Sequence, residues 1–169
     1  EGCCFLVAPH GVAQRPEITG WYAAFGDLIE PPAGGVGYAR DASRFFGATF
    51  DPSGIYRFNA VQDMLAEEGL TTHVMSAHVQ GLLETLSRRI GDGKAGKLSE
   101  GTQLNDVSHM PCARFLALQH PDAKVWQKAL HTAGVMTDVR GDVLRLGLAI
   151  YHDENDIERF CKIAASVLT

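Results

Sequence analysis

The stretch that decides the fold covers residues 142–160 and reads Asp-Val-Leu-Arg-Leu-Gly-Leu-Ala-Ile-Tyr-His-Asp-Glu-Asn-Asp-Ile-Glu-Arg-Phe. Its first part is an apolar run typical of a buried strand, and this run contains one arginine, Arg145. A guanidinium in such a strand is costly unless an anion meets it, and its planar fork suits a carboxylate. Two interpretations stay open: the strand presents Arg145 to a carboxylate ligand, or Arg145 faces solvent or pairs with an internal Asp or Glu.

The sequence around this stretch predicts the sheet to which the strand belongs. A strand is expected over residues 113–119, a helix over 121–133, and two strands over 135–139 and 143–150 joined by a glycine turn. An aspartate then caps a final helix, which is expected to bury Ile157, Phe160, Cys161, Ala164 and Leu168. The order β-α-β-β-α predicts an α/β (α+β) unit with its helices on one side of a mainly antiparallel sheet.

Two helices are expected upstream of this unit. Asp51 and Pro52 start the first, which runs to about residue 68 and stops at Gly69. Thr71 begins a longer connecting helix, which ends at Gly91. One face of this helix is expected to carry the residues that recur at near-helical spacing, namely Val74, His78, Leu82, Leu86 and Ile90.

Less regular structure is expected elsewhere. Residues 3–8 form a short apolar run that fits a buried strand, and residues 10–50 read as a long irregular segment. Residues 92–111 read as a polar loop. Residues 91–97 superficially match a phosphate-binding loop, but Leu98 stands where that motif needs Ser or Thr, so a flexible solvated turn is predicted.

Composition and charge exclude several classes of protein. With 169 residues, 46% of them hydrophobic, the chain can bury a core. The net charge of −5, without a cluster of basic residues in sequence, argues against nucleic-acid and membrane partners, and no apolar stretch reaches membrane-spanning length. The spacing of the four cysteines fits neither a disulfide framework nor a metal site, so reduced thiols in a cytoplasmic protein are expected.

Two upstream segments offer groups for a ligand. Trp21, in Gly20-Trp21-Tyr22, is either core packing or an indole N–H donor to a ligand. Thr49 lies where a loop enters the first helix, so its hydroxyl serves either as a helix cap or as a phosphate contact. The residues alone leave both alternatives open.

Three segments in this order resemble the C-terminal portion of the class V, fold-type I pyridoxal-phosphate enzymes, most nearly the kynureninase-like aminotransferases. They are Gly20-Trp21-Tyr22, then Gly47-Ala48-Thr49-Phe50-Asp51-Pro52, then residues 143–152 with Asp156-Ile157. The resemblance spans roughly residues 2–168. It implies a remnant of the cofactor-binding large domain over residues 1–70 and a small domain, with the connecting helix, over residues 71–169.

The resemblance also implies roles for single residues. Arg145 matches the arginine that binds the α-carboxylate of an amino-acid substrate. Trp21 and Thr49 match positions that contact the cofactor phosphate, in this family often from the neighbouring subunit of a homodimer. Ala23-Ala24 stand where the kynureninase pattern has Gly-His, and His152 stands where the family has Asn, so the substrate and reaction subtype stay open.

The family places its Schiff-base lysine upstream of the segment that matches residues 1–9. None of the five lysines matches that position, and all are expected in a loop or on helix surfaces: Lys94, Lys97, Lys124, Lys128 and Lys162. We therefore expect part of a longer enzyme, with no catalytic residue of its own, inactive alone, without bound cofactor, and dimeric through exposed apolar surface. The alternative is a stand-alone α+β amino-acid-binding or regulatory domain without catalysis.

Overall fold

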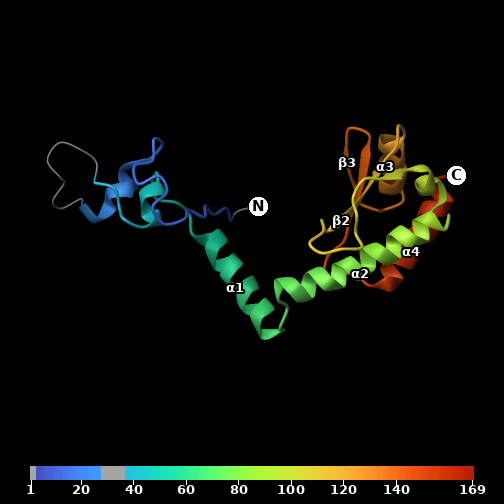
Figure 1. Ribbon diagram of the computed structural model, residues 1–169, viewed down its shortest axis with the longest axis horizontal. Helices are drawn as coiled ribbons and strands as arrows, with labels where there is room; N and C mark the ends of the chain where they lie inside the picture. Colours follow the sequence, from blue (N-terminus) through green and yellow to red (C-terminus); the bar gives the residue numbers. More distant parts are fainter. Residues whose placement is uncertain (1–2, 28–36) are drawn as a thin grey trace. The chain divides into compact units, whose positions relative to one another are not determined.

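The computed structural model describes residues 3–27 and 37–169 (Figure 1). The chain divides into two compact units, Glu1–Glu67 and Glu68–Thr169, which we call unit 1 and unit 2 and treat separately. That the first belongs to a large cofactor-binding domain and the second to a small domain stays a prediction.

Unit 2 is built on a four-stranded sheet in the order β1-β2-β4-β3, and every neighbouring pair is antiparallel. Its strands are β1 (Thr102–Gln103), β2 (Phe115–Gln119), β3 (Asp138–Arg140) and β4 (Val143–Gly147). Gly141, at φ +63°, makes the tight turn between β3 and β4, because glycine adopts positive φ without steric cost. The predicted β-α-β-β-α order is confirmed, with shorter strands than expected.

Helices α2 (Thr72–Gly91), α3 (Ala123–Thr132) and α4 (Glu154–Val167) supply the rest of the core. The register of β2 and β4 sets Leu116 opposite Leu146 and Leu118 opposite Leu144, and all four side chains are buried. They pack with the apolar faces of the helices in one cluster. Figure 1 shows α2 and α4 running along each other, and the two helices are in contact. The structure is therefore the α+β fold that the sequence predicts.

Local signals place these helices where the sequence predicted them. The Asp153 side chain accepts a hydrogen bond from the Asp156 N–H at 3.0 Å, and Asp156 reciprocates, which completes a capping box at the start of α4. Thr71 caps α2 through the Val74 N–H at 3.2 Å. The apolar face of α2 is only partly as expected, because Val74 and His78 are exposed while Val79 and Leu83 are buried.

The polar loop predicted over residues 92–111 is wrong in two places. It contains the edge strand β1 and a short 3-10 helix, η3 (Gly96–Glu100), whose Leu98 is fully buried in the core. A Cβ at Gly96 would lie 2.5 Å from the Leu168 carbonyl oxygen, and the Lys97 N–H donates to that same oxygen at 3.0 Å. The solvated turn predicted over residues 91–97 is confirmed in part, because residues 92–94 form an exposed turn, whereas Ala95 is buried and Gly96 packs against the end of α4.

The described part of unit 1 contains two 3-10 helices, η1 (Trp21–Asp27) and η2 (Ala42–Phe45), and the helix α1 (Ser53–Glu67). The α1 helix begins and ends as predicted, and the Asp51 carboxylate accepts from the Ser53 N–H at 2.9 Å. The strand predicted over residues 3–8 is wrong. A strand needs a partner, and the described part of unit 1 contains no other strand, so Phe5, Leu6 and Val7 lie exposed.

Candidate functional site

Arg145 lies in the middle of β4, on the sheet face opposite the buried leucines. The register places it between Ala117 of β2 and Asp138 of β3. Its side chain is 32% exposed, so it is neither buried in the core nor fully solvated. The alternation of side chains along β4 produces this position, because Leu144 and Leu146 point into the core and the residue between them points away.

Arg145 is paired with an internal carboxylate. Its Nε donates to Asp138 Oδ2 at 2.8 Å, and its Nη2 donates to the same oxygen. Arg140 Nε also donates to this oxygen, at 3.3 Å. The hydrogen bond from Arg145 is the main cause that lowers the pKa of Asp138, and the charges of Arg140 and Arg145 add to it. Of the two interpretations of Arg145, the internal ion pair is present in the structure.

The same arginine also lines an open cavity. This cavity has a volume of about 450 Å³ and is bounded by Arg114, Phe115, Met136, Thr137, Asp138, Arg145 and Gly147. The Arg145 guanidinium lies 5.3 Å from the centre of the Phe115 ring, which holds it in place by a cation–π contact. Arg114 donates to Ser76 Oγ at 3.1 Å. Two arginines and one aspartate line this cavity, so an anionic group is favoured there.

The partners of Arg145 were not singled out from the sequence, although a signal existed. A two-residue turn at Gly141-Asp142 pairs Arg140 with Val143, and the antiparallel register then pairs Asp138 with Arg145. His152, which stands where the family has Asn, has a structural role: its Nδ1 accepts from the Ala149 N–H at 3.0 Å. The His152 carbonyl also lies 2.9 Å from His78 Nε2, so His78 contacts the loop before α4 and not the core.

Trp21 and Thr49 both belong to unit 1 and come from two segments in close contact. A Cβ at Gly20 would lie only 1.9 Å from the Gly47 carbonyl oxygen, so the two backbones touch at these glycines. A chain of ring contacts links the same segments, from Trp21 to Tyr22 at 5.4 Å, to Phe46 at 5.6 Å and on to Phe50 at 5.8 Å. The fold thus brings together the segment that contains Trp21 and the segment that contains Thr49.

These two residues fit the chemistry of a phosphate site. Trp21 is 52% exposed and Thr49 is also exposed. In the part of the chain that the structure describes, neither the Trp21 indole N–H nor the Thr49 hydroxyl forms an intramolecular hydrogen bond. Both remain available as donors to phosphate oxygens. The five lysines lie as predicted, outside the core, and all are exposed on turns or helix surfaces of unit 2.

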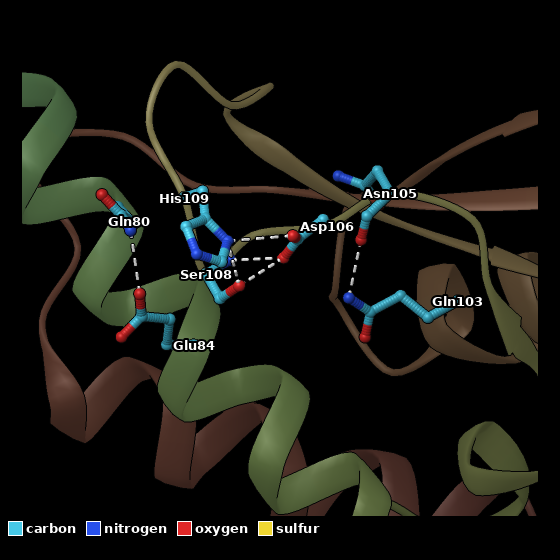
Figure 2. A network of polar contacts seen from close by, with 7 residues as sticks. All are labelled: Gln80, Glu84, Gln103, Asn105, Asp106, Ser108 and His109. Atoms are coloured by element: carbon cyan, nitrogen blue, oxygen red, sulfur yellow. Dashed lines mark hydrogen bonds and ion pairs between the residues drawn. The ribbon is translucent and has the colours of Figure 1, made fainter.

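A cluster of Asp106, Ser108 and His109 has the composition of a catalytic triad but a different geometry. Figure 2 shows that His109 Nδ1 contacts both Ser108 Oγ, at 2.8 Å, and Asp106 Oδ2, at 3.1 Å. A triad needs separate ring nitrogens for the serine and the carboxylate. Ser108 Oγ instead donates directly to Asp106 Oδ1 at 2.6 Å, and this bond is the main cause that lowers the Asp106 pKa to about 2. The cluster stabilises a turn.

The described residues form neither a metal site nor a membrane-spanning helix. Within residues 3–27 and 37–169, no group of three or more His, Cys, Asp or Glu side chains is placed to hold a metal ion. None of the helices in these described ranges is both long and apolar enough to span a membrane.

Comparisons with known proteins give a likeness of fold. No family model and no curated protein matches the chain. A solved structure described as a NIFS-like protein matches with a TM-score of 0.52 at 15% sequence identity. The match covers 75% of this chain and 36% of the other, so this chain corresponds to about a third of that protein's length. At this identity the comparison shows a shared fold.

Proposed function

We propose that this chain is the C-terminal portion of a pyridoxal-phosphate-dependent enzyme, and that Arg145 holds the carboxylate of its amino-acid substrate. The observation that carries the proposal is an arginine on the open face of a sheet, lining a cavity of about 450 Å³. Two further findings support it. The three segments stand in the order of the class V enzymes that they resemble, and the fold is similar to that of a NIFS-like protein.

In this role Arg145 exchanges one carboxylate for another. Its Nε and Nη2 both donate to the single oxygen Asp138 Oδ2, so the edge of the guanidinium that could hold both oxygens of a substrate carboxylate already faces an anion. Asp138 is 47% exposed and keeps Arg140 as a partner, so it can withdraw from Arg145 without losing all its charge compensation. Asp138 therefore competes with the substrate and holds Arg145 in position until the substrate arrives.

Unit 1 would contribute the phosphate contacts. The Trp21 indole N–H and the Thr49 hydroxyl are the proposed donors, and the Gly20–Gly47 contact fixes the segments that carry them. When bound, pyridoxal phosphate supplies the electron sink for reactions at the substrate α-carbon. Because the family often uses these contacts across a subunit boundary, we propose a homodimer, with exposed apolar side chains such as Phe5, Val7 and Tyr56 available for the interface. A cytoplasmic location completes the proposal.

The experiment is a comparison of this chain with the protein encoded by the complete reading frame. Both are incubated with pyridoxal phosphate, reduced with borohydride and weighed by mass spectrometry. We expect an adduct on one lysine upstream of this segment in the longer protein and none on the five lysines of this chain. Arg145→Lys in the longer protein should raise KM for the amino acid more than it lowers the adduct yield. A stoichiometric adduct on a lysine of this chain would overturn the proposal.

A second candidate function is a stand-alone amino-acid-binding or regulatory domain. The pairing of Arg145 with Asp138 favours it, because one group can take a carboxylate and the other an ammonium ion. The reading frame separates the candidates. A start codon close to Glu1 with no upstream lysine supports the binding domain, whereas an upstream coding region with a lysine that reacts with pyridoxal phosphate supports the enzyme.

A further inference from the structure

A separate cavity in unit 1, which we call the basic cavity, has three arginines among its lining residues. Its volume is about 730 Å³, and its polar lining consists of His10, Gln14, Arg15, Tyr38, Arg40 and Arg44. Among the lining residues that the structure describes, three are arginines and none is Asp or Glu. The sequence did not reveal this basic cavity, because its residues come from two segments more than twenty positions apart that only the fold brings together.

Arg44 is a buried cation for which the described residues provide no carboxylate partner. Its side chain belongs to a residue only 6% exposed. The guanidinium donates to three backbone carbonyls, those of Ala13 at 3.1 Å, Asp41 at 2.5 Å and Val12 at 2.7 Å. These bonds use three of its five N–H groups, the Phe45 ring centre lies 4.6 Å from the guanidinium, and no carboxylate of the described residues forms an ion pair with it. Buried charges are normally met by an opposite charge, so the cavity beside Arg44 favours an anion.

Asp41, three positions before Arg44 in the sequence, is engaged elsewhere. The Asp41 carboxylate is exposed and accepts from the Ser43 N–H at 2.9 Å, which caps η2. This bond to Ser43 is the main cause that lowers the pKa of Asp41, and the charge of Arg44 is the smallest contribution. Asp41 therefore does not take the place of an anion in the cavity.

The walls of the basic cavity are already fixed. Arg44 ties residues 12–13 to η2, and the Tyr38 hydroxyl donates to the Pro16 carbonyl at 3.3 Å. The Arg15 guanidinium lies 5.0 Å from the centre of the Tyr38 ring, which positions it without using its hydrogen-bond donors. In the described part of the chain neither Arg15 nor Arg40 donates a hydrogen bond, so two guanidinium groups are available to a ligand.

We propose that the basic cavity binds a phosphorylated small molecule. Guanidinium groups bind phosphate oxygens through paired, charge-assisted hydrogen bonds, and Arg15 and Arg40 are the proposed contacts. A volume of about 730 Å³ lies within the roughly 300–1,000 Å³ of typical small-molecule sites and leaves room for an organic group beside the phosphate. None of the residues that line this cavity is Trp21, Thr49 or Arg145, so the site is separate from the one proposed above.

The test is a calorimetric titration of the full chain with inorganic pyrophosphate at low ionic strength. The wild-type chain should bind at one site per chain, and Arg15→Ala and Arg40→Ala should each weaken binding by about tenfold or more. Arg57→Ala is the matched control, because it removes the same charge from an exposed position on α1 in the same unit. This control should keep the wild-type affinity within about twofold, and added salt should weaken binding.

Two results would overturn the proposal. One is the absence of saturable pyrophosphate binding to the wild-type chain. The other is an equal loss of affinity in Arg57→Ala and in the two cavity variants, which would mean that pyrophosphate follows overall charge. Thr49→Val separates this proposal from the proposed function, because it removes a proposed cofactor-phosphate contact and should leave pyrophosphate binding in the basic cavity unchanged. Thermal unfolding of each variant checks that the exposed arginines were removed without loss of structure.

Discussion

Gly20→Ala is the sharpest test of how unit 1 is assembled. A Cβ at this position would lie 1.9 Å from the Gly47 carbonyl oxygen, 2.6 Å from its carbonyl carbon and 2.9 Å from its Cα. Ordinary contact begins near 3.4 Å, so the two segments must separate by about 1.5 Å. Both partners are backbone and cannot rotate away as a flexible side chain does. Overpacking of this kind costs about 1–3 kcal/mol, and we expect the upper end of that range.

Equilibrium urea unfolding followed by tryptophan fluorescence measures this cost. The chain has two tryptophans, Trp21 in unit 1 and Trp126 buried in α3 of unit 2. In a Trp126→Phe background the signal comes from unit 1 alone. Gly26→Ala is the control, because it makes the same substitution in the same unit at a position where the added Cβ would meet no atom of the described residues within 4 Å.

The two variants should differ clearly. Gly26→Ala should unfold at nearly the same urea concentration as its parent, whereas Gly20→Ala should unfold at a distinctly lower one. Gly20→Ala should also weaken any phosphate contact made jointly by Trp21 and Thr49, because it moves their segments apart. If Gly20→Ala and Gly26→Ala proved equally stable, the close approach of the two segments, and with it the shared site, would be refuted.

Three further predictions concern unit 2. Leu98→Ala should destabilise unit 2 by about 2–5 kcal/mol in chemical denaturation, because Leu98 is fully buried. A loss of stability as small as that of a surface substitution would contradict the burial of Leu98 in the core. Thr71→Ala should cost about 0.5–2 kcal/mol through loss of the α2 cap, and Thr71→Ser should restore most of it. The lowered pKa of Asp138 means that its contribution to stability is complete above the ordinary value of 3.8 and is lost as pH falls below it. Asp138→Asn should therefore flatten the acid side of the stability profile, and an unchanged profile would contradict the ion pair.

The sequence predicted the C-terminal unit well because its signals are local. The Asp153 cap, the Gly141 turn and the alternation around Arg145 each act over a few residues, and the β-α-β-β-α order follows from them. The predictions from sequence were wrong where contacts between residues far apart in the chain determine the local structure. Leu98 is buried only because α4 and α2 cover it, and β1 forms only because the edge of β2 is available to pair with it.

The same distinction applies to the candidate site. Arg145 stood out in the sequence because a charge in an apolar strand is unusual. Asp138 could be identified as its partner only from the register of β3 and β4, and Arg114 only from the pairing of β2 with β4. The apolar run at residues 3–8 predicted a strand by composition alone, and without a partner strand in the described part of unit 1 the composition did not suffice. Nothing in the sequence indicated the basic cavity, because Arg15 and Arg40 come to line the same cavity only in the folded unit.

The central claim, that Arg145 anchors a carboxylate, is tested most directly by following its Nε–H resonance by NMR during titration with acetate. Acetate carries a carboxylate without an ammonium group, so it reports on the arginine alone. We expect a saturable shift of the Arg145 signal in the wild-type chain and tighter binding in Asp138→Asn, where the internal competitor is gone. In Arg145→Gln, neighbouring backbone amides should show no saturable shifts. An Arg145 resonance that acetate leaves unmoved in both the wild type and Asp138→Asn would contradict a carboxylate-binding role for Arg145.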